Sequence, residues 1–165
     1  MKKIYIAAPL FSKAELNFNK RIKDILMPHF DVFLPQEDGD LLVDKVKSGE
    51  NSEIAKKRIF VQDTNAVKAC DCLLIVLDGR TIDEGASFEL GYAFALNKVC
   101  VGFQSDPRRL LPSGNNPMID ESLVEVVTSF NELAEWAKRY ARNLLSFKKV
   151  SNSTNNIQSG KIRVI

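Results

Sequence analysis

The sequence alternates short, continuous apolar runs with longer segments whose apolar residues recur at the helical period. The clearest example is the apolar run at residues 72–77, which is followed by a small and apolar segment at residues 86–97 and a second apolar run at residues 99–103. Strands that read as continuous apolar runs are buried on both faces, and the helices between them provide the crossovers that parallel strands need. The pattern predicts an α/β fold: a flavodoxin-like or Rossmann-like three-layer sandwich with a five-stranded parallel sheet.

The same alternation predicts the positions of the other elements. We expect strands at residues 3–8, 31–34, 72–77, 99–103 and 124–127, and helices at about residues 13–27, 51–69, 86–97 and 129–145. A capping-box pattern, Ser129 followed by Glu132, opens the last helix. Two long loops, at residues 36–49 and 104–121, each follow a strand. We therefore expect both loops at the edge of the sheet where ligands bind in such folds.

The composition excludes several classes of protein. The chain has 165 residues and a net charge of +2, which is too small to indicate nucleic-acid binding. The opening apolar run ends at Pro9 and is too short for a signal peptide or a membrane span, and the three cysteines have no metal-binding or disulfide spacing. No glycine-rich dinucleotide motif or phosphate loop is present. We expect a cytoplasmic protein with no cofactor, metal, nucleic-acid partner or membrane partner, in which residues 1–147 form one domain and residues 148–165 a polar, mobile tail.

Glu89 is the single carboxylate in a segment that is otherwise apolar or small from residue 86 to residue 96. The segment follows a predicted strand, so Glu89 should lie in the first turns of a helix that begins at the carboxyl end of that strand. A buried ionisable residue persists in such a place only when it is paired or used. Glu89 is therefore our first catalytic candidate, and the alternative is a buried ion pair with Arg80 or another base.

Two further carboxylates lie near Glu89 in this pattern. Asp83 falls in the loop before the helix, where it is either a catalytic group or the cap of the helix. Asp63 interrupts an apolar row on the predicted helix at residues 51–69. It is either catalytic or the edge of the apolar stripe, facing solvent or paired with Lys56 or Lys68.

The residue types available favour one class of chemistry. The only histidine, His29, precedes a strand and so lies away from the carboxyl edge of the sheet, which argues against a serine–histidine triad or a histidine metal site. Glycosyl transfer can proceed with carboxylates alone, without a serine–histidine triad or a histidine metal site. One carboxylate attacks or stabilises the anomeric carbon, and another acid protonates or orients the leaving group. A covalent glycosyl-enzyme would let an acceptor other than water collect the sugar. Tyr5, inside the first strand, is a core residue unless its hydroxyl finds a polar partner.

These residues resemble the nucleoside 2-deoxyribosyltransferase family along nearly the whole chain. The motifs that carry the resemblance are the first strand with Tyr5, the segment Gln62-Asp63-Thr64-Asn65-Ala66-Val67, and above all Asp83-Glu-Gly-Ala-Ser-Phe-Glu89-Leu-Gly-Tyr-Ala. The resemblance implies that Glu89 is the nucleophile that forms a deoxyribosyl-enzyme and that Tyr5 orients it. It also implies that Asp63 and Asp83 surround the base and the sugar.

The resemblance further implies a substrate-binding set and a homo-oligomer with active sites shared between subunits. Gln36 would contact the base. Asn116 would reach the sugar hydroxyls of a nucleoside bound in the active site of a neighbouring subunit, although a plain turn explains Asn116 nearly as well. The set is completed by Phe11, Gly85, Ser87 and Met118. The partners implied are 2′-deoxyribonucleosides and free nucleobases, which suits a role in purine and pyrimidine salvage.

Two alternative functions stay open from the sequence. Hydrolases that cleave nucleoside 5′-monophosphates share the Phe/Tyr-Glu-Leu-Gly helix, and Ser87 could meet a 5′-phosphate at the helix amino end. The other alternative is a non-catalytic nucleotide-sensing module on the same sandwich.

Overall fold

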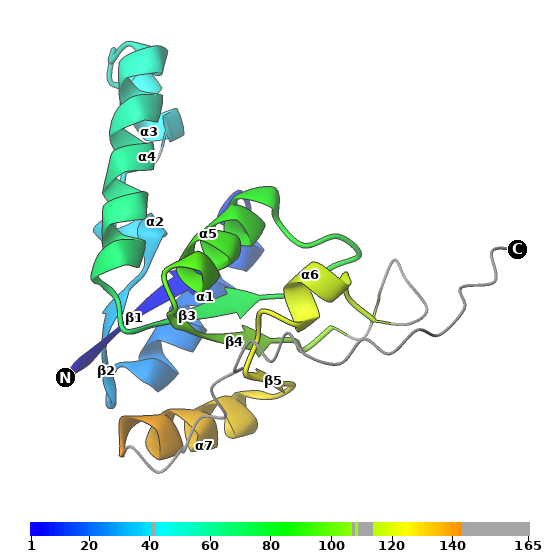
Figure 1. Ribbon diagram of the computed structural model, residues 1–165. Helices are drawn as coiled ribbons and strands as arrows, with labels where there is room; N and C mark the ends of the chain where they lie inside the picture. Colours follow the sequence, from blue (N-terminus) through cyan, green and yellow to red (C-terminus); the bar gives the residue numbers. More distant parts are fainter. Residues whose placement is uncertain (41, 107, 109–113, 143–165) are drawn as a thin grey trace, which may run out of the picture.

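The computed structural model describes residues 1–40, 42–106, 108 and 114–142. Its centre is a five-stranded sheet with the order β2-β1-β3-β4-β5, in which every neighbouring pair is parallel (Figure 1). The strands are β1 (Lys2–Ala7), β2 (Phe30–Phe33), β3 (Cys72–Val76), β4 (Val99–Phe103) and β5 (Glu125–Val127). The helices are α1 (Lys13–Leu26), α2 (Pro35–Asp38), α3 (Leu42–Lys47), α4 (Ser52–Ala69), α5 (Glu84–Ala95), α6 (Pro117–Asp120) and α7 (Phe130–Ala141). The predicted α/β sandwich with a five-stranded parallel sheet is confirmed.

The helices form two layers, one on each face of the sheet. The core beneath α1 and α7 includes Ile4 and Ile6 of β1 and Trp136 of α7, all fully buried. The core beneath α4 and α5 includes Tyr5 of β1 and Leu90 of α5. Successive side chains of a strand point to opposite faces, so Tyr5 lies on the α4–α5 side because Ile4 and Ile6 lie on the other.

Side-chain caps set the beginning of each long helix. Ser12 and Glu15 form a reciprocal capping box at α1, in which the Ser12 hydroxyl accepts from the Glu15 N–H and the Glu15 carboxylate accepts from the Ser12 N–H. Ser129 caps α7 by accepting from the Glu132 N–H, but the Glu132 carboxylate accepts from Thr128 instead. Of the two hydrogen bonds of the capping box predicted at α7, only the one to the Ser129 hydroxyl forms.

The boundaries of several elements differ from those expected. α5 begins at Glu84, two residues early, because Asp83 is its cap, and it ends at Ala95 before Asn97, which adopts a left-handed backbone conformation with φ of 57°. The other boundaries differ by one or two residues at most within the described part of the chain. Residues 143–145 of the last predicted helix and the tail at residues 148–165 lie outside the described residues.

The two long segments predicted as loops contain short helices. Residues 36–49 carry most of α2 and all of α3, and residues 104–121 carry α6. Each is six residues or fewer, which is too short to show a helical period in sequence. Figure 1 shows that α4 extends beyond the sheet with α3 beside its outer part. Among the described residues, no helix is long and apolar enough to cross a membrane.

Candidate active site

Tyr5 and Glu89 meet at the carboxyl end of the central strands. β1 pairs directly with β3, and α5 begins a few residues after β3 ends, so the first turns of α5 lie above Tyr5. The Tyr5 hydroxyl donates a hydrogen bond of 2.5 Å to Oε1 of Glu89. The Tyr5 ring stacks on the ring of Phe33 in β2, with 5.4 Å between the ring centroids. This contact restrains the Tyr5 ring and so helps to keep its hydroxyl in position.

Glu89 is stabilised by a neutral donor and not by a cation. In the described part of the chain, no lysine or arginine forms an ion pair with its carboxylate, so the predicted alternative of a pair with Arg80 or another base is wrong there. Burial, together with the charges of Asp63 and Asp83, raises the pKa of Glu89 to about 8, although the Tyr5 hydrogen bond acts in the opposite direction. Burial and the Glu89 charge likewise raise the pKa of Tyr5, so Tyr5 remains a donor at neutral pH.

Asp63 faces Glu89 from α4. Burial raises the pKa of Asp63 to about 6, with a further contribution from the charge of Asp40. The described residues contain no ion pair between Asp63 and Lys56 or Lys68, and Lys56 pairs with Glu53 at 2.9 Å. The structural alternative that made Asp63 an ion-pair partner is therefore wrong among these residues. A carboxyl group with a pKa near neutrality can give up and regain a proton during a reaction.

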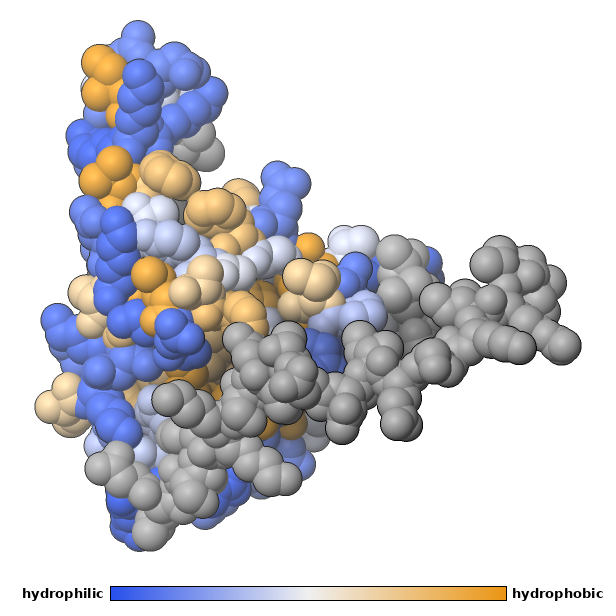
Figure 2. Space-filling model, in the orientation of Figure 1, coloured by the Kyte–Doolittle hydropathy of each residue, from blue (hydrophilic) through white to orange (hydrophobic). Residues whose placement is uncertain are grey.

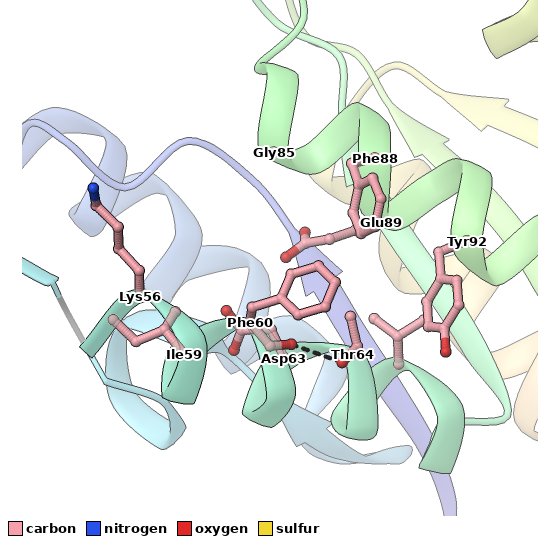
Figure 3. A pocket seen from close by; sticks show the side chains of 10 residues that line it. Lys56, Ile59, Phe60, Asp63, Thr64, Gly85, Phe88, Glu89 and Tyr92 are labelled. Carbon is pink, nitrogen blue, oxygen red and sulfur yellow. Dashed lines mark hydrogen bonds between the residues drawn. The ribbon is translucent and has the colours of Figure 1, made fainter. Parts of the chain in front are cut away.

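A cavity of about 280 Å³ separates α4 from α5 and contains both acids. Figure 3 shows Glu89 reaching from α5 toward α4, where Asp63 approaches the same space. The cavity is lined by Lys56, Ile59, Phe60, Asp63, Thr64, Val67, Gly85, Phe88, Glu89 and Tyr92. Phe60 and Phe88 are more than half exposed at its rim, and Figure 2 shows apolar residues gathered where α4 faces α5. Two carboxyl groups at the base of an apolar cavity form a site that is suited to a small organic substrate.

Asp83 is the cap of α5, as the capping alternative predicts. Its Oδ1 accepts a hydrogen bond of 2.8 Å from the Ala86 N–H, and its charge also acts on Glu89. Gly85 is close to this cap, because a Cβ there would lie 3.1 Å from Oδ1 of Asp83. The Ser87 hydroxyl donates to the Asp83 carbonyl oxygen at 2.8 Å. The capping role and a role in the reaction are compatible, because the carboxylate keeps a second oxygen.

A second cavity, of about 510 Å³, lies on the other side of the α5 amino end. Its lining includes Arg80 from the β3–α5 loop, Ser87 from α5, and Asn116 and Met118 from α6. The Asn116 side chain caps α6 by accepting a hydrogen bond of 2.9 Å from the Met118 N–H. Locally, Asn116 therefore has the structural role that the turn interpretation predicts. Its side chain also lines the second cavity, beside α5.

A family model described as nucleoside 2-deoxyribosyltransferase matches residues 4–152, which includes every residue of both cavities. The chain belongs to the nucleoside 2-deoxyribosyltransferase family.

Individual relatives of this family member are distant in sequence. A conserved protein of known structure from Enterococcus faecalis V583 is 30% identical, with a TM-score of 0.64 over 85% of this chain and 99% of that one. The 2-deoxyribosyltransferase of Bacillus psychrosaccharolyticus is 25% identical, with a TM-score of 0.64 over 80% of this chain and 90% of that one. The protein UU063 of Ureaplasma parvum serovar 3 is 30% identical over 97 residues, which are 58% of this chain and 61% of that protein. The chain thus spans about three fifths of the length of that curated relative.

Two residues predicted for substrate binding line neither cavity. Phe11 lies in the loop after β1 with 80% of its surface exposed, and its N–H donates to the Glu15 carboxylate. Gln36, in α2, forms hydrogen bonds with α1: its Nε2 donates to the Leu16 carbonyl oxygen at 2.9 Å, and its Oε1 accepts from Asn19 at 3.0 Å. Both residues are at the carboxyl edge of the sheet, but each is tied to α1 in this nucleoside 2-deoxyribosyltransferase family member.

The sequence reasoning missed much of the cavity wall. Lys56, Phe60 and Thr64 form a row at the i, i+4 spacing beside the row that contains Asp63. Phe88 and Tyr92 have the same spacing on α5, and their rings stack with 6.1 Å between centroids. The spacing alone was visible in the sequence, but which side of each helix faced the other was not. Within the described ranges, no three histidine, cysteine, aspartate or glutamate side chains come together as metal ligands would.

Proposed function

We propose that this protein transfers the 2-deoxyribosyl group between the nucleobases of 2′-deoxyribonucleosides through a covalent glycosyl-enzyme on Glu89. The observation that carries the proposal is the Glu89 carboxylate, which is held by the neutral Tyr5 hydroxyl beside a cavity that also contains Asp63. With a pKa of about 8 for Glu89 and about 6 for Asp63, the proton shared by the pair resides mainly on Glu89. The reactive form is the less populated one, in which Glu89 is ionised and Asp63 is protonated, and the Tyr5 hydroxyl stabilises this ionised Glu89 without neutralising it as a cation would. Membership of the family and the 25% identity with a named 2-deoxyribosyltransferase support the same reaction. We propose residues 1–147 as the domain that carries it.

The two displacements assign a task to each group. Tyr5 engages Oε1 of Glu89, which leaves Oε2 to attack C1′ of the nucleoside. The C1′–N bond breaks, its electron pair leaves with the base, and the protonated carboxyl of Asp63 donates a proton to that base. A second base then attacks C1′ from the opposite side, the C1′–O bond to Glu89 breaks, and Asp63 regains a proton from the incoming base. The two inversions retain the configuration at C1′.

The second cavity favours one alternative, a nucleoside 5′-monophosphate N-glycosidase. The cavity contains Arg80 and Ser87 beside the amino end of α5, and among the described residues no ion pair or hydrogen bond engages the Arg80 side chain. A guanidinium next to a helix amino end suits a phosphate. In this alternative Glu89 keeps its task, and water replaces the second base.

The acceptor experiment separates the two functions. The protein is incubated with deoxyinosine or thymidine, with and without free adenine, and the products are separated. Base exchange predicts deoxyadenosine and faster consumption of the donor when adenine is present. Release of deoxyribose 5-phosphate from a 2′-deoxynucleoside 5′-monophosphate, at a rate that adenine does not change, would establish the hydrolase instead. Tight nucleotide binding without turnover, and unaffected by Glu89→Ala, would indicate the sensing module.

The covalent step has its own test. Glu89→Gln should abolish exchange, because an amide is a poor nucleophile, whereas Glu84→Gln on the exposed side of the same helix should leave it nearly unchanged. Trapping with a 2-fluoro-2-deoxy nucleoside should add one sugar mass to the peptide that contains Glu89. A sugar attached to Asp63 or Asp83 would overturn the assignment of the nucleophile.

A further inference from the structure

Two aromatic rings from opposite helices meet at the rim of the cavity that contains Glu89 and Asp63. Phe60 of α4 and Phe88 of α5 both line this cavity, and their ring centroids are 5.9 Å apart at an interplanar angle of 46°. This is a normal separation for an aromatic pair, so the two rings contact each other between the helices. Figure 3 shows the Phe60 ring reaching from α4 into the space beside α5.

The fold does not bury these rings in its own core. The Phe60 side chain is 57% exposed and the Phe88 side chain 52% exposed, and among the described residues the two hydrophobic cores contain neither ring. Large apolar side chains that are exposed next to each other indicate contact with a ligand or partner. Because both rings line the cavity that contains the acids, the ligand of this cavity is the partner that they fit.

The other polar side chains of the cavity offer a water molecule few free partners. The Lys56 ammonium group pairs with Glu53 at 2.9 Å, and the Thr64 hydroxyl donates to a backbone carbonyl oxygen of α4 at 2.7 Å. The Tyr92 hydroxyl points away from Glu89 (Figure 3). Apart from these side chains and the two acids, the lining residues are apolar or glycine. An ordered water needs about two to four polar partners, so this cavity disfavours water except at the acids themselves.

In the proposed function, the deoxyribosyl-enzyme on Glu89 has two possible acceptors, a base and water. A base nitrogen attacks C1′, the electron pair of the C1′–O bond returns to the Glu89 carboxylate, and Asp63 takes a proton from the base. Water reacts in the same way: its oxygen bonds to C1′, Asp63 takes one of its protons, and free 2-deoxyribose leaves. The two acids serve both reactions equally, so other residues must select the acceptor.

We propose that Phe60 and Phe88 make this selection, because their rings stack on the acceptor base and exclude water from the covalent intermediate. The inference rests on the proposed function, in which Asp63 exchanges a proton with the base and so requires the base in this cavity. Phe60 is three residues before Asp63 on α4, and Phe88 immediately precedes Glu89 on α5, so each helix presents one ring and one acid to the cavity. Every nucleobase has a flat face that stacks on an aromatic ring, whereas water has none.

The second displacement can be measured alone on enzyme trapped with a 2-fluoro-2-deoxy nucleoside. Recovery of the free enzyme is followed in buffer, where water is the acceptor, and with increasing adenine. The wild type is compared with Phe60→Ala, Phe88→Ala, Phe60→Leu and Phe94→Ala. Phe94 is the matched control, because it is also on α5 and is 51% exposed but does not line the cavity. Thermal unfolding verifies that each variant is folded.

The variants should separate stacking from the exclusion of water. In Phe60→Ala and Phe88→Ala, the adenine concentration that half-saturates recovery should rise roughly tenfold, a usual consequence of losing a stacked ring. Recovery in buffer should become several-fold faster, because water reaches C1′ more easily. Phe60→Leu keeps an apolar side chain without a ring, so it should raise the half-saturating adenine concentration but leave recovery in buffer unchanged. Phe94→Ala should match the wild type in both measurements.

Two results would overturn the inference in an enzyme that exchanges bases. One is an unchanged half-saturating adenine concentration and an unchanged recovery in buffer in both alanine variants at residues 60 and 88. The other is the same change in Phe94→Ala, because it would show that the loss of any exposed ring has this effect.

The proposed function fails in a different way, through a wild type that neither exchanges bases nor forms the trapped adduct. Adenine binding to the wild type and to Phe60→Ala is then measured by calorimetry. Roughly tenfold weaker binding in the variant would support the aromatic site without the transfer reaction. Equal binding, or no measurable binding to either protein, would overturn the inference as well.

Discussion

Glu89 is largely buried, and its hydrogen-bond partner, the Tyr5 hydroxyl, is neutral. Burial favours the protonated form of its carboxyl group, and no cation opposes this effect among the described residues. Its pKa of about 8 in the folded protein compares with an ordinary value of 4.5. The folded state therefore holds a proton on Glu89 over a pH range in which the unfolded chain has lost it. Two measurable consequences follow, one for stability and one for activity.

The stability of the protein should fall with rising pH because of Glu89. A group whose pKa is raised by folding stabilises fully below its unfolded value, here about 4.5, and this stabilisation is lost as the pH rises through the folded value of about 8. Glu89→Gln keeps the shape and does not titrate, so its melting temperature should exceed that of the wild type by roughly 4 °C or more at pH 8.5 and by less at pH 5. A difference that is constant between pH 5 and pH 8.5 would contradict the raised pKa.

Tyr5→Phe should shift the pH dependence of catalysis as well as lower the rate. The Tyr5 hydrogen bond stabilises the ionised form of Glu89, so its removal should raise the pKa of Glu89 above about 8. Because the reactive form also needs Asp63 protonated, and the pKa of Asp63 is the lower of the two at about 6, the higher pKa of Glu89 sets the basic limb of the kcat/KM profile in the free enzyme. This basic limb should move to higher pH, and the maximum of the profile should fall. Phe33→Leu, which removes a ring that stacks on Tyr5 but leaves the hydroxyl, is the matched control and should move the limb less. A limb that stays in place in Tyr5→Phe would separate Tyr5 from the nucleophile.

Helix α5 carries the proposed nucleophile, Glu89, and its amino end carries Asp83, a residue with two potential tasks. Asp83 caps the helix through Oδ1, and its charge acts on Glu89. The two tasks respond differently to substitution, because asparagine can accept the same capping hydrogen bond but carries no charge. Substitutions at Asp83 can therefore distinguish its capping role from a role in catalysis.

Asp83→Asn should leave the free energy of unfolding nearly unchanged and should slow exchange. Asp83→Ala should lower the free energy of unfolding by about 1 kcal/mol, the usual effect of losing a cap, in addition to slowing exchange. Urea unfolding and exchange rates with several donor nucleosides measure both. Because the lost charge assists base departure in this proposal, donors with better leaving bases should lose less activity. Full activity in Asp83→Asn would restrict Asp83 to its capping role.

At the scale of the whole molecule, the second cavity is exposed to solvent where it meets α6. Asn116 and Met118 are both exposed there, with 81% of the Met118 surface accessible. We propose that the protein is a homo-oligomer in which these residues complete the site of a neighbouring subunit. The proposal explains an exposed methionine and an exposed amide beside an active-site helix.

Subunit mixing tests the shared site. A complete site needs Glu89 from one subunit and Asn116 from another, so an equal mixture of the inactive variants Glu89→Ala and Asn116→Ala should recover about a quarter of wild-type activity after exchange. A mixture of Glu89→Ala with Glu89→Gln contains no intact nucleophile and should recover none. Sedimentation that shows an active monomer, or no recovery after verified exchange, would leave Asn116 with its turn role alone.

The sequence was sufficient for properties that depend on neighbouring residues. The apolar runs predicted the five parallel strands, because a strand buried on both faces needs apolar residues at every position. The Ser12, Asn51, Asp83 and Ser129 side chains cap helices because a cap involves only residues two or three positions away. The lone acid in an apolar helix made Glu89 the first catalytic candidate, because burying an unpaired charge is unfavourable in any fold.

Contacts between distant segments needed the folded chain. Tyr5 and Glu89 are 84 residues apart, and nothing in either local pattern indicates that a hydroxyl, and not Arg80, meets the carboxylate. Gln36 and Asn19 form their hydrogen bond only because α1 and α2 pack at the same edge of the sheet. The short helices α2, α3 and α6 escaped prediction because helices of six residues or fewer are stabilised by caps and packing more than by their own periodicity. Periodicity and capping are therefore readable in the sequence because they act over a few residues, whereas the partner of a buried polar group depends on which elements pack together.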